Sequence, residues 1–188
     1  VSIFIFLISC NIETEKDLKN KRPNIILILS DDMGYSDIAP YGGEIDTPNL
    51  TSLAKDGLKF TQFYNAARCC PTRASLLTGN YPHEAGVGHM TNPPNDINGH
   101  NYGVPEYQGK LSSNVVTIAE VLRSSGYSTL MSGKWHLSFF DKNQWPIQRG
   151  FDKFYGFISG AGNYFKPEAP RQIFEGNNVI KINDEEYY

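Results

Sequence analysis

Two short stretches of the sequence gather side chains that could bind an anion and attack it. The first contains Cys69, Pro71 and Arg73 and continues into Leu77-Thr78-Gly79. Pro71 suits the first turn of a helix, which puts Cys69 at the positive helix end and Arg73 about one turn later on the same face. A nucleophile beside a guanidinium at such an end fits sulfate or phosphate. On these residues alone, a reactive thiolate and a small buried cysteine near a structural arginine ion pair both stay open.

The second stretch carries two basic groups at a spacing of two residues, Lys134 and His136. They follow residues 127–132, which we predict to be a strand. In an extended chain Lys134 and His136 share one side, and Trp135 faces the other side, into packing. A cation and a titratable imidazole suit an anionic ester. Taken alone, the pair also fits a solvated strand end.

Two tandem carboxylates, Asp31 and Asp32, follow the uninterrupted aliphatic run of residues 25–29. Such a run is typical of a parallel strand covered on both faces, and ligands bind at the carboxyl ends of such strands. Adjacent carboxylates repel each other unless a cation lies between them, and oxygen-only ligands favour Ca²⁺ or Mg²⁺. A solvated turn that caps a helix explains Asp31-Asp32 equally well.

The elements that must position these residues alternate along the chain. We predict strands at 25–29, 58–64 and 127–132, helices from Thr47 to Gly57, at 71–78 and at 115–122 (capped by Asn114), and a long loop at 80–110. Strands that alternate with helices predict an α/β fold with a mostly parallel central sheet flanked by helices.

Composition narrows the classes of function. The chain has 188 residues, 40% of them apolar, and a formal net charge of −3. This composition argues against disorder and against a strongly basic nucleic-acid-binding protein. The three cysteines, Cys10, Cys69 and Cys70, are too few for a disulfide framework or for a four-thiolate zinc site.

The first ten residues are interpreted as a clipped lipoprotein signal segment. The apolar run of residues 1–8 is too short to span a bilayer, and Leu7-Ile8-Ser9-Cys10 resembles the lipobox of bacterial lipoproteins. A buried strand is the alternative interpretation. Residues 11–22 form a polar tether. We therefore expect an extracytoplasmic bacterial protein, in the periplasm or at the cell surface, held to the membrane by a lipid on Cys10.

The two chemical stretches together resemble the sulfatase family. Cys69-x-Pro71-x-Arg73, extended by Leu77-Thr78-Gly79, is similar to the family's maturation motif, in which the cysteine becomes formylglycine (3-oxoalanine). Residues 126–137 resemble the second motif, although Ser138 stands where the family usually has glycine. Further similarity lies at residues 23–34, 47–50, 81–83 and 149–152.

This resemblance implies an alkaline-phosphatase-like fold, incomplete in this chain, and a sulfuric ester hydrolase acting on glycan or aryl sulfates. A formylglycine-generating maturation enzyme would convert Cys69, whose hydrated aldehyde attacks sulfur. Ca²⁺ or Mg²⁺ would be held by Asp31, Asp32 and residue 69. Arg73 and Lys134 would stabilise negative charge, and His136 would orient the nucleophile or exchange a proton with it.

The resemblance also implies that residues 23–188 are the N-terminal part of a sulfatase catalytic domain. The family's Asp-Asn pair, its further His and its further Lys are expected downstream, so this stretch alone is expected to be inactive. Two alternatives stay open: a phosphoesterase or phosphonate hydrolase of the same superfamily, and a non-catalytic, lipid-anchored glycan-binding protein.

Overall fold

The computed structural model describes residues 22–91 and 101–182. The chain divides into two compact units, residues 1–33 and residues 34–188, which are described separately. The expected signal segment and residues 11–21 of the tether lie outside the described residues. Among the described helices, none has the length and apolar character needed to cross a membrane.

In the first unit, the described residues 22–33 form neither helix nor strand. The strand predicted at residues 25–29 is therefore wrong. Its aliphatic side chains are exposed, Ile26 by 82%. An aliphatic run has strand propensity, but a strand exists only where a neighbouring strand pairs with it, and the described part of this unit offers none.

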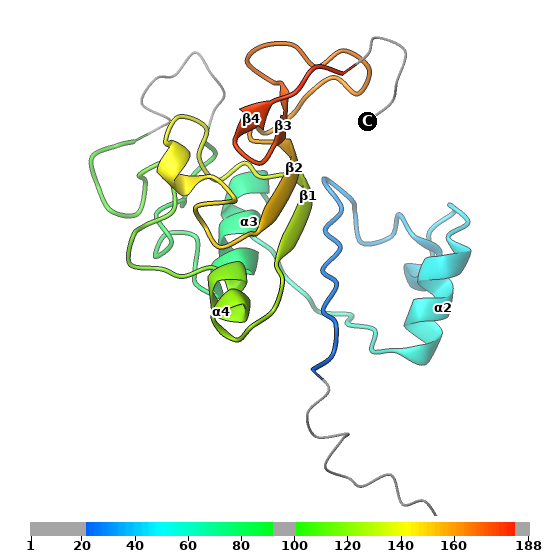
Figure 1. The fold of residues 1–188 in the computed structure, drawn as a ribbon. Helices are drawn as coiled ribbons and strands as arrows, with labels where there is room; N and C mark the ends of the chain where they lie inside the picture. The colour runs from blue at the N-terminus through cyan, green and yellow to red at the C-terminus, as the bar shows by residue number, and fades with distance from the viewer. Residues whose placement is uncertain (1–21, 92–100, 183–188) are drawn as a thin grey trace, which may run out of the picture. The chain divides into compact units, whose positions relative to one another are not determined.

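The second unit contains all the described regular elements (Figure 1). The helical elements are η1 (Ala39–Tyr41), α2 (Pro48–Asp56), α3 (Cys69–Thr78), α4 (Ile118–Ser124) and η2 (Lys142–Gln144). The strands are β1 (Leu130–Lys134), β2 (Lys153–Phe157), β3 (Ile173–Glu175) and β4 (Asn178–Val179).

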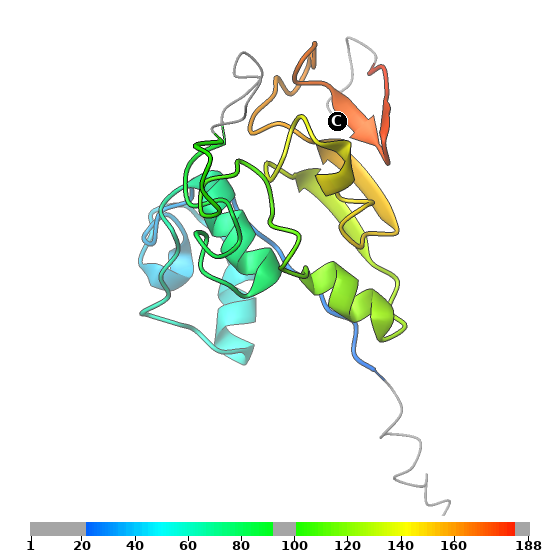
Figure 2. The same ribbon diagram turned by 90° about the vertical axis from the view of Figure 1, so that its left-hand side faces the viewer.

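The four strands form one sheet in the order β1-β2-β3-β4. β1 and β2 are parallel, with Leu130 opposite Lys153 and Lys134 opposite Phe157. β3 and β4 return antiparallel and lie beyond β2, away from α3 (Figures 1 and 2). The described sheet is thus mixed: β1 and β2 are parallel, and the short turn between β3 and β4 permits only antiparallel neighbours.

Near the C-terminal ends of β1 and β2, two glycines lie opposite each other, Gly133 and Gly156. Both have positive φ, +111° and +145°. A Cβ on Gly156 would collide with the carbonyl oxygen of Gly133. The backbones of β1 and β2 therefore meet more closely at this point than any side chain would allow.

The predicted helices are present, with shifted ends. α3 begins at Cys69, two residues before the predicted start, and ends at Gly79, whose φ is +70°. α4 is capped by Thr117 rather than by Asn114, which corrects the prediction. Thr117 and Glu120 form a reciprocal capping box: the Glu120 N–H donates to Thr117 Oγ1 (3.1 Å), and the Thr117 N–H donates to Glu120 Oε2 (2.6 Å).

The strand predicted at residues 58–64 is not observed. These residues carry no regular structure, and their large side chains are exposed, Tyr64 by 85%. The long loop predicted at 80–110 contains no helix or strand in its described parts. An isolated bridge joins Val87 to Tyr107 across it.

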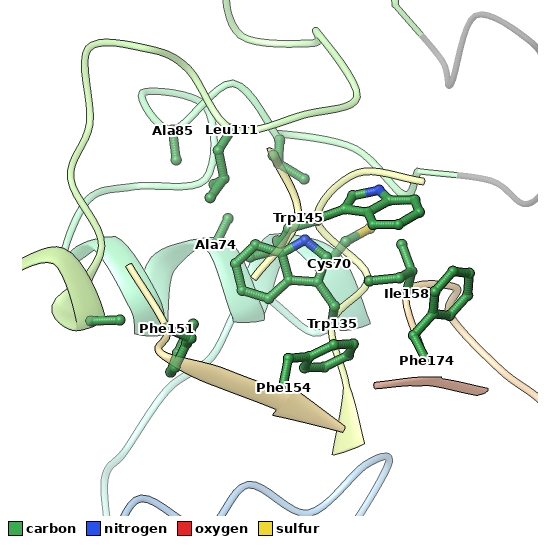
Figure 3. Close-up of a cluster of buried hydrophobic side chains, with 13 residues drawn as sticks. Cys70, Ala74, Ala85, Leu111, Trp135, Trp145, Phe151, Phe154, Ile158 and Phe174 are labelled. Atoms are coloured by element: carbon green, nitrogen blue, oxygen red, sulfur yellow. The ribbon is translucent and has the colours of Figure 1, made fainter. Parts of the chain in front are cut away.

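The core of the second unit is built around Trp135, the residue between the two predicted basic groups. Trp135 is fully buried, as the sequence predicted, and its indole N–H donates to the Gln144 carbonyl (3.0 Å). Figure 3 shows Cys70 and Phe154 beside it. α3 and the chain that follows β1 are thus joined by one apolar cluster, which positions the residues described next.

Candidate functional site

The six residues proposed from the sequence fall in both units. Asp31 and Asp32 lie in the first unit, where both are exposed and Asp32 has a φ of +56°. Cys69, Arg73, Lys134 and His136 lie in the second unit. The grouping of the aspartates with Cys69 stays a prediction, whereas the positions of the other residues follow from α3 and β1.

Cys69 is the first residue of α3 and is half-buried. The turn before it is fixed locally, because the Ala66 N–H donates to Thr72 Oγ1 (3.2 Å) and Ala67 adopts a φ of +54°. The predicted placement of residue 69 at the positive end of a helix is therefore what the structure has. This end favours a negative charge on residue 69 or on a group bound to it.

Arg73 lies one turn further along α3 and is only 8% exposed. Its Nη1 donates to the main-chain oxygen of Lys134 at 2.5 Å. Lys134 is the last residue of β1 and is partly exposed. The two sequence stretches that carry chemistry, 61 residues apart, are thus joined by a charge-assisted hydrogen bond.

His136 lies beyond the end of β1 and is 8% exposed. Its φ is +59°, a left-handed conformation that non-glycine residues seldom adopt and that is frequent at functional sites. The extended geometry predicted for Lys134 through His136 is therefore wrong, because the chain turns at His136. The His136 N–H still donates to the Ile158 carbonyl (3.1 Å), which holds the turn against the residues after β2.

The imidazole of His136 is held by two residues that the sequence analysis did not single out. Its Nε2 lies 2.9 Å from the carbonyl oxygen of Thr91. Gly160 lies against the ring, and a Cβ there would collide with it. No local pattern points to Thr91, whereas the small-residue run from Ser159 to Gly162 was a signal of close packing that sequence reasoning missed.

The two adjacent cysteines have different environments. Cys70 is fully buried, and its Sγ accepts a hydrogen bond from the Thr91 N–H (2.9 Å). Burial raises the pKa of the Cys70 thiol, although the hydrogen bonds with Thr91 act in the opposite direction. A buried thiol that stays protonated is a poor nucleophile, so the structure favours Cys69 over Cys70 as the reactive position.

The run from Arg149 to Asp152, similar to a family motif, has structural contacts rather than chemical ones. The Arg149 guanidinium donates to the Val115 carbonyl (2.7 Å), and Asp152 Oδ2 accepts from the Thr129 N–H (2.9 Å). A Cβ on Gly150, whose φ is +95°, would collide with the backbone of Glu120. These residues fasten α4 and the start of β1 to the chain before β2.

Comparison with known proteins decides the family. Residues 23–187 match the family model described as Sulfatase. The chain belongs to the sulfatase family. The resemblance that the two motifs indicated is therefore confirmed.

Curated sulfatases from distant organisms align with most of this chain. An arylsulfatase of Klebsiella aerogenes is 40% identical over 168 residues, which cover 89% of this chain and 35% of the relative. Arylsulfatase J of Mus musculus is 38% identical over 174 residues, which cover 89% of this chain and 27% of the relative. The chain thus spans about a third or less of the length of these curated sulfatases.

Among solved structures, Ps i-CgsB superposes on 86% of this chain with a TM-score of 0.71 and 33% sequence identity, over 38% of its own length. The α/β, alkaline-phosphatase-like fold class that the sequence implied is confirmed by this similarity. The mixed, open four-stranded sheet is the part of that fold described here.

Proposed function

We propose that this chain supplies the nucleophile and part of the anion site of an enzyme that hydrolyses sulfate esters. The observation that carries the proposal is the hydrogen bond from Arg73 to Lys134. It joins the stretch that contains Cys69 to the stretch that contains His136, in a chain of the sulfatase family. The two stretches form one site, as an anionic substrate requires.

Residue 69 is the proposed nucleophile, after conversion of Cys69 to formylglycine by a maturation enzyme. When hydrated, the aldehyde would supply one hydroxyl oxygen that bonds to sulfur and displaces the alcohol, and a second hydroxyl whose deprotonation restores the aldehyde and expels sulfate. The helix end and the partial exposure of residue 69 serve both steps. The backbone N–H groups there favour an ionised oxygen, and a substrate can reach it.

Arg73 and Lys134 supply the positive charge that a sulfate group needs. The Lys134 carbonyl orients the guanidinium of Arg73, which is nearly buried, so little reorganisation accompanies the reaction. Lys134 is partly exposed at the end of β1 and carries its ammonium on a flexible stem. Together they offset the charge that grows on the sulfuryl oxygens. His136 orients the nucleophile or exchanges a proton with it.

Asp31 and Asp32 are the proposed ligands of a divalent cation, together with residue 69. Carboxylate oxygens are the donors that Ca²⁺ and Mg²⁺ prefer. Both side chains are exposed, and the φ of +56° at Asp32 belongs to a conformation found at functional sites. When bound, the cation would polarise the sulfate oxygens and favour the ionised nucleophile.

Sulfated glycans or aryl sulfates are the proposed substrates. A solved structure of the similar protein Ps i-CgsB is a complex with k-i-k-neocarrahexaose, and the curated relatives include arylsulfatases. We further propose that the protein works outside the cytoplasm, anchored by a lipid on Cys10. That residue lies outside the described part of the chain, and its sequence context supports the proposal.

The test compares sulfate and phosphate esters of the same aryl alcohol as substrates of the full-length protein. We expect turnover of the sulfate ester to be much faster and to be lost in Cys69→Ala, with folding unchanged. Mass spectrometry should find position 69 lighter by about 18 Da than a cysteine. Faster turnover of the phosphate ester would favour a phosphoesterase, and no turnover with an intact thiol would favour a non-catalytic binding protein.

A further inference from the structure

Cys70 contacts one short segment of the chain through three separate interactions. Its Sγ accepts from the Thr91 N–H (2.9 Å) and lies 3.6 Å from both the His89 carbonyl oxygen and the Met90 Sδ. All of these contacts are made by a sulfur that is fully buried on α3. The side chain of Cys70 therefore holds the segment from His89 to Thr91 against α3.

Thr91 uses its other backbone group to hold the imidazole of His136. The carbonyl oxygen of Thr91 lies 2.9 Å from His136 Nε2. A carbonyl oxygen can only accept a hydrogen bond, so Nε2 must carry the hydrogen. It follows that Nδ1 is the nitrogen at which His136 gains or loses its proton. The left-handed backbone of His136 and the close packing of Gly160 hold the same ring from other sides.

We propose that Cys70 is a positioning residue that fixes the orientation and the tautomer of His136 through the backbone of Thr91. The proposal rests on the proposed function, in which His136 exchanges a proton at the reacting centre. α3 would then carry two roles in adjacent residues. Residue 69 reacts, and residue 70 keeps the proton-carrying ring in place.

Three replacements of Cys70 separate this role from simple packing. Cys70→Ser keeps a hydrogen-bond acceptor for the Thr91 N–H and loses some volume. Cys70→Val fills the space with a somewhat larger apolar side chain and removes the acceptor, and Cys70→Ala removes both volume and acceptor. If Cys70 only fills space, Val should stay closer to the native behaviour than Ser does. If Cys70 positions Thr91, the order is reversed.

The readout that does not depend on activity is the tautomer of His136, measured by long-range ¹H–¹⁵N correlation in full-length protein labelled with ¹⁵N-histidine. The His136 signal is assigned with His136→Gln. We expect the Nε2–H tautomer in the native protein and in Cys70→Ser, and a mixture of tautomers in Cys70→Val and Cys70→Ala. As a control, Leu111→Ala, a change at another buried residue of the core, should lower the melting temperature without changing the tautomer.

The kinetic readout is the separate effect of each variant on kcat and on KM for a sulfate ester. The value of kcat is normalised to the fraction of protein that carries formylglycine at position 69. That correction matters because Cys70 lies inside the maturation motif. We expect kcat to fall about 10- to 100-fold in Cys70→Val, with KM changed by less than about threefold. Cys70→Ser should recover most of the native kcat.

An Nδ1–H tautomer in the native protein would overturn the proposal without any variant. Native tautomer and native kcat in Cys70→Val would also overturn it, as would a loss of kcat with the tautomer unchanged. If the native protein turns over no sulfate ester, the proposed function fails. The tautomers of the Cys70 variants still decide whether Cys70 positions His136.

Discussion

The guanidinium of Arg73 donates to the main-chain oxygen of Lys134 at 2.5 Å, and this bond joins α3 to the end of β1. Because the acceptor is a backbone atom, the bond fixes the position of Arg73 without consuming the ammonium of Lys134. Two cationic side chains can therefore be directed at one anion from two different elements. The bond therefore gives Arg73 a structural role besides its proposed role in binding the substrate.

Replacement of Arg73 should lower both stability and activity. Arg73→Lys keeps the charge but loses the planar donor fork that reaches the Lys134 carbonyl. A buried charged hydrogen bond contributes about 1.5–3 kcal/mol, so we expect a loss of that size in urea unfolding. We expect kcat/KM for a sulfate ester to fall at least about 100-fold. Arg123→Lys, in an exposed ion pair with Asp152, is the matched control and should change neither value appreciably.

Addition of one methyl group at Gly160 should displace the imidazole of His136. The Cβ of Gly160→Ala would collide with the ring, so we expect kcat for a sulfate ester to fall about 10- to 100-fold. Gly176→Ala is the control, since Gly176 has a φ of +57° and open space around its position. It should cost about 1 kcal/mol of stability by backbone strain alone and leave kcat unchanged. Equal kcat in the two variants would contradict this interpretation of the His136 contact.

The stability of the second unit should decrease in acid through Asp152. The backbone hydrogen bond from Thr129 holds the pKa of this carboxyl below its ordinary value of 3.8, and the Arg123 charge acts in the same direction. A carboxyl whose folded pKa is lowered contributes stability above its unfolded pKa and loses that contribution as pH falls through the folded value. We therefore expect the melting temperature to drop below about pH 4. The Asp152→Asn variant should be less stable at neutral pH and should show a smaller drop.

Thr117 should contribute more to the free energy of unfolding than an ordinary helix cap does. Its Oγ1 accepts from the Glu120 N–H and also donates to the carbonyl oxygen of Arg149 (2.7 Å), in a fully buried position. A cap alone contributes about 1 kcal/mol, and a carbonyl left without its donor adds about 1–3 kcal/mol. We expect Thr117→Ala to lose about 2–4 kcal/mol in urea unfolding. Thr117→Ser keeps the hydroxyl and should retain most of this stability. If Thr117→Ser and Thr117→Ala lose the same free energy of unfolding, the methyl group of Thr117 matters more than its hydroxyl.

Removal of divalent cations should abolish turnover reversibly. We expect a chelator to lower the rate with a sulfate ester, and added Ca²⁺ to restore it, because the two aspartates would otherwise repel each other. Asp32→Asn should bind Ca²⁺ more weakly. The variant should therefore need a higher Ca²⁺ concentration than the native protein to recover half of the full rate. A chelator-treated enzyme that keeps its full rate would contradict the metal proposal.

Local signals in the sequence predicted the helices well and the strands unevenly. Pro48 and Gly57 bracket α2, and Gly79 ends α3, because such residues act on the backbone at their own position. Thr117 with Glu120 three residues later is the same kind of signal and marks the true start of α4, whereas the predicted cap was Asn114. The runs at 25–29 and 58–64 have strand composition, yet a strand needs a partner that composition does not reveal.

For the candidate site, too, the sequence predicted what depends on local patterns and did not predict the long-range contacts. Residue types and spacing were enough to nominate Cys69, Arg73, Lys134 and His136, since the motifs are local. The contacts that hold those side chains are not local. Thr91 meets His136 across 45 residues, and no sequence pattern links the two. The turn at His136 also escaped prediction, because a positive φ at a non-glycine residue is imposed by the surrounding fold.

The contrast between the two neighbouring cysteines has a practical consequence. Cys70 is sealed inside the core, whereas Cys69 is partly open to solvent. An alkylating reagent applied to the native protein should therefore mark position 69 only where the thiol persists, and should spare position 70. Peptide mapping after such labelling would report, molecule by molecule, how completely the chain has been converted in a given host.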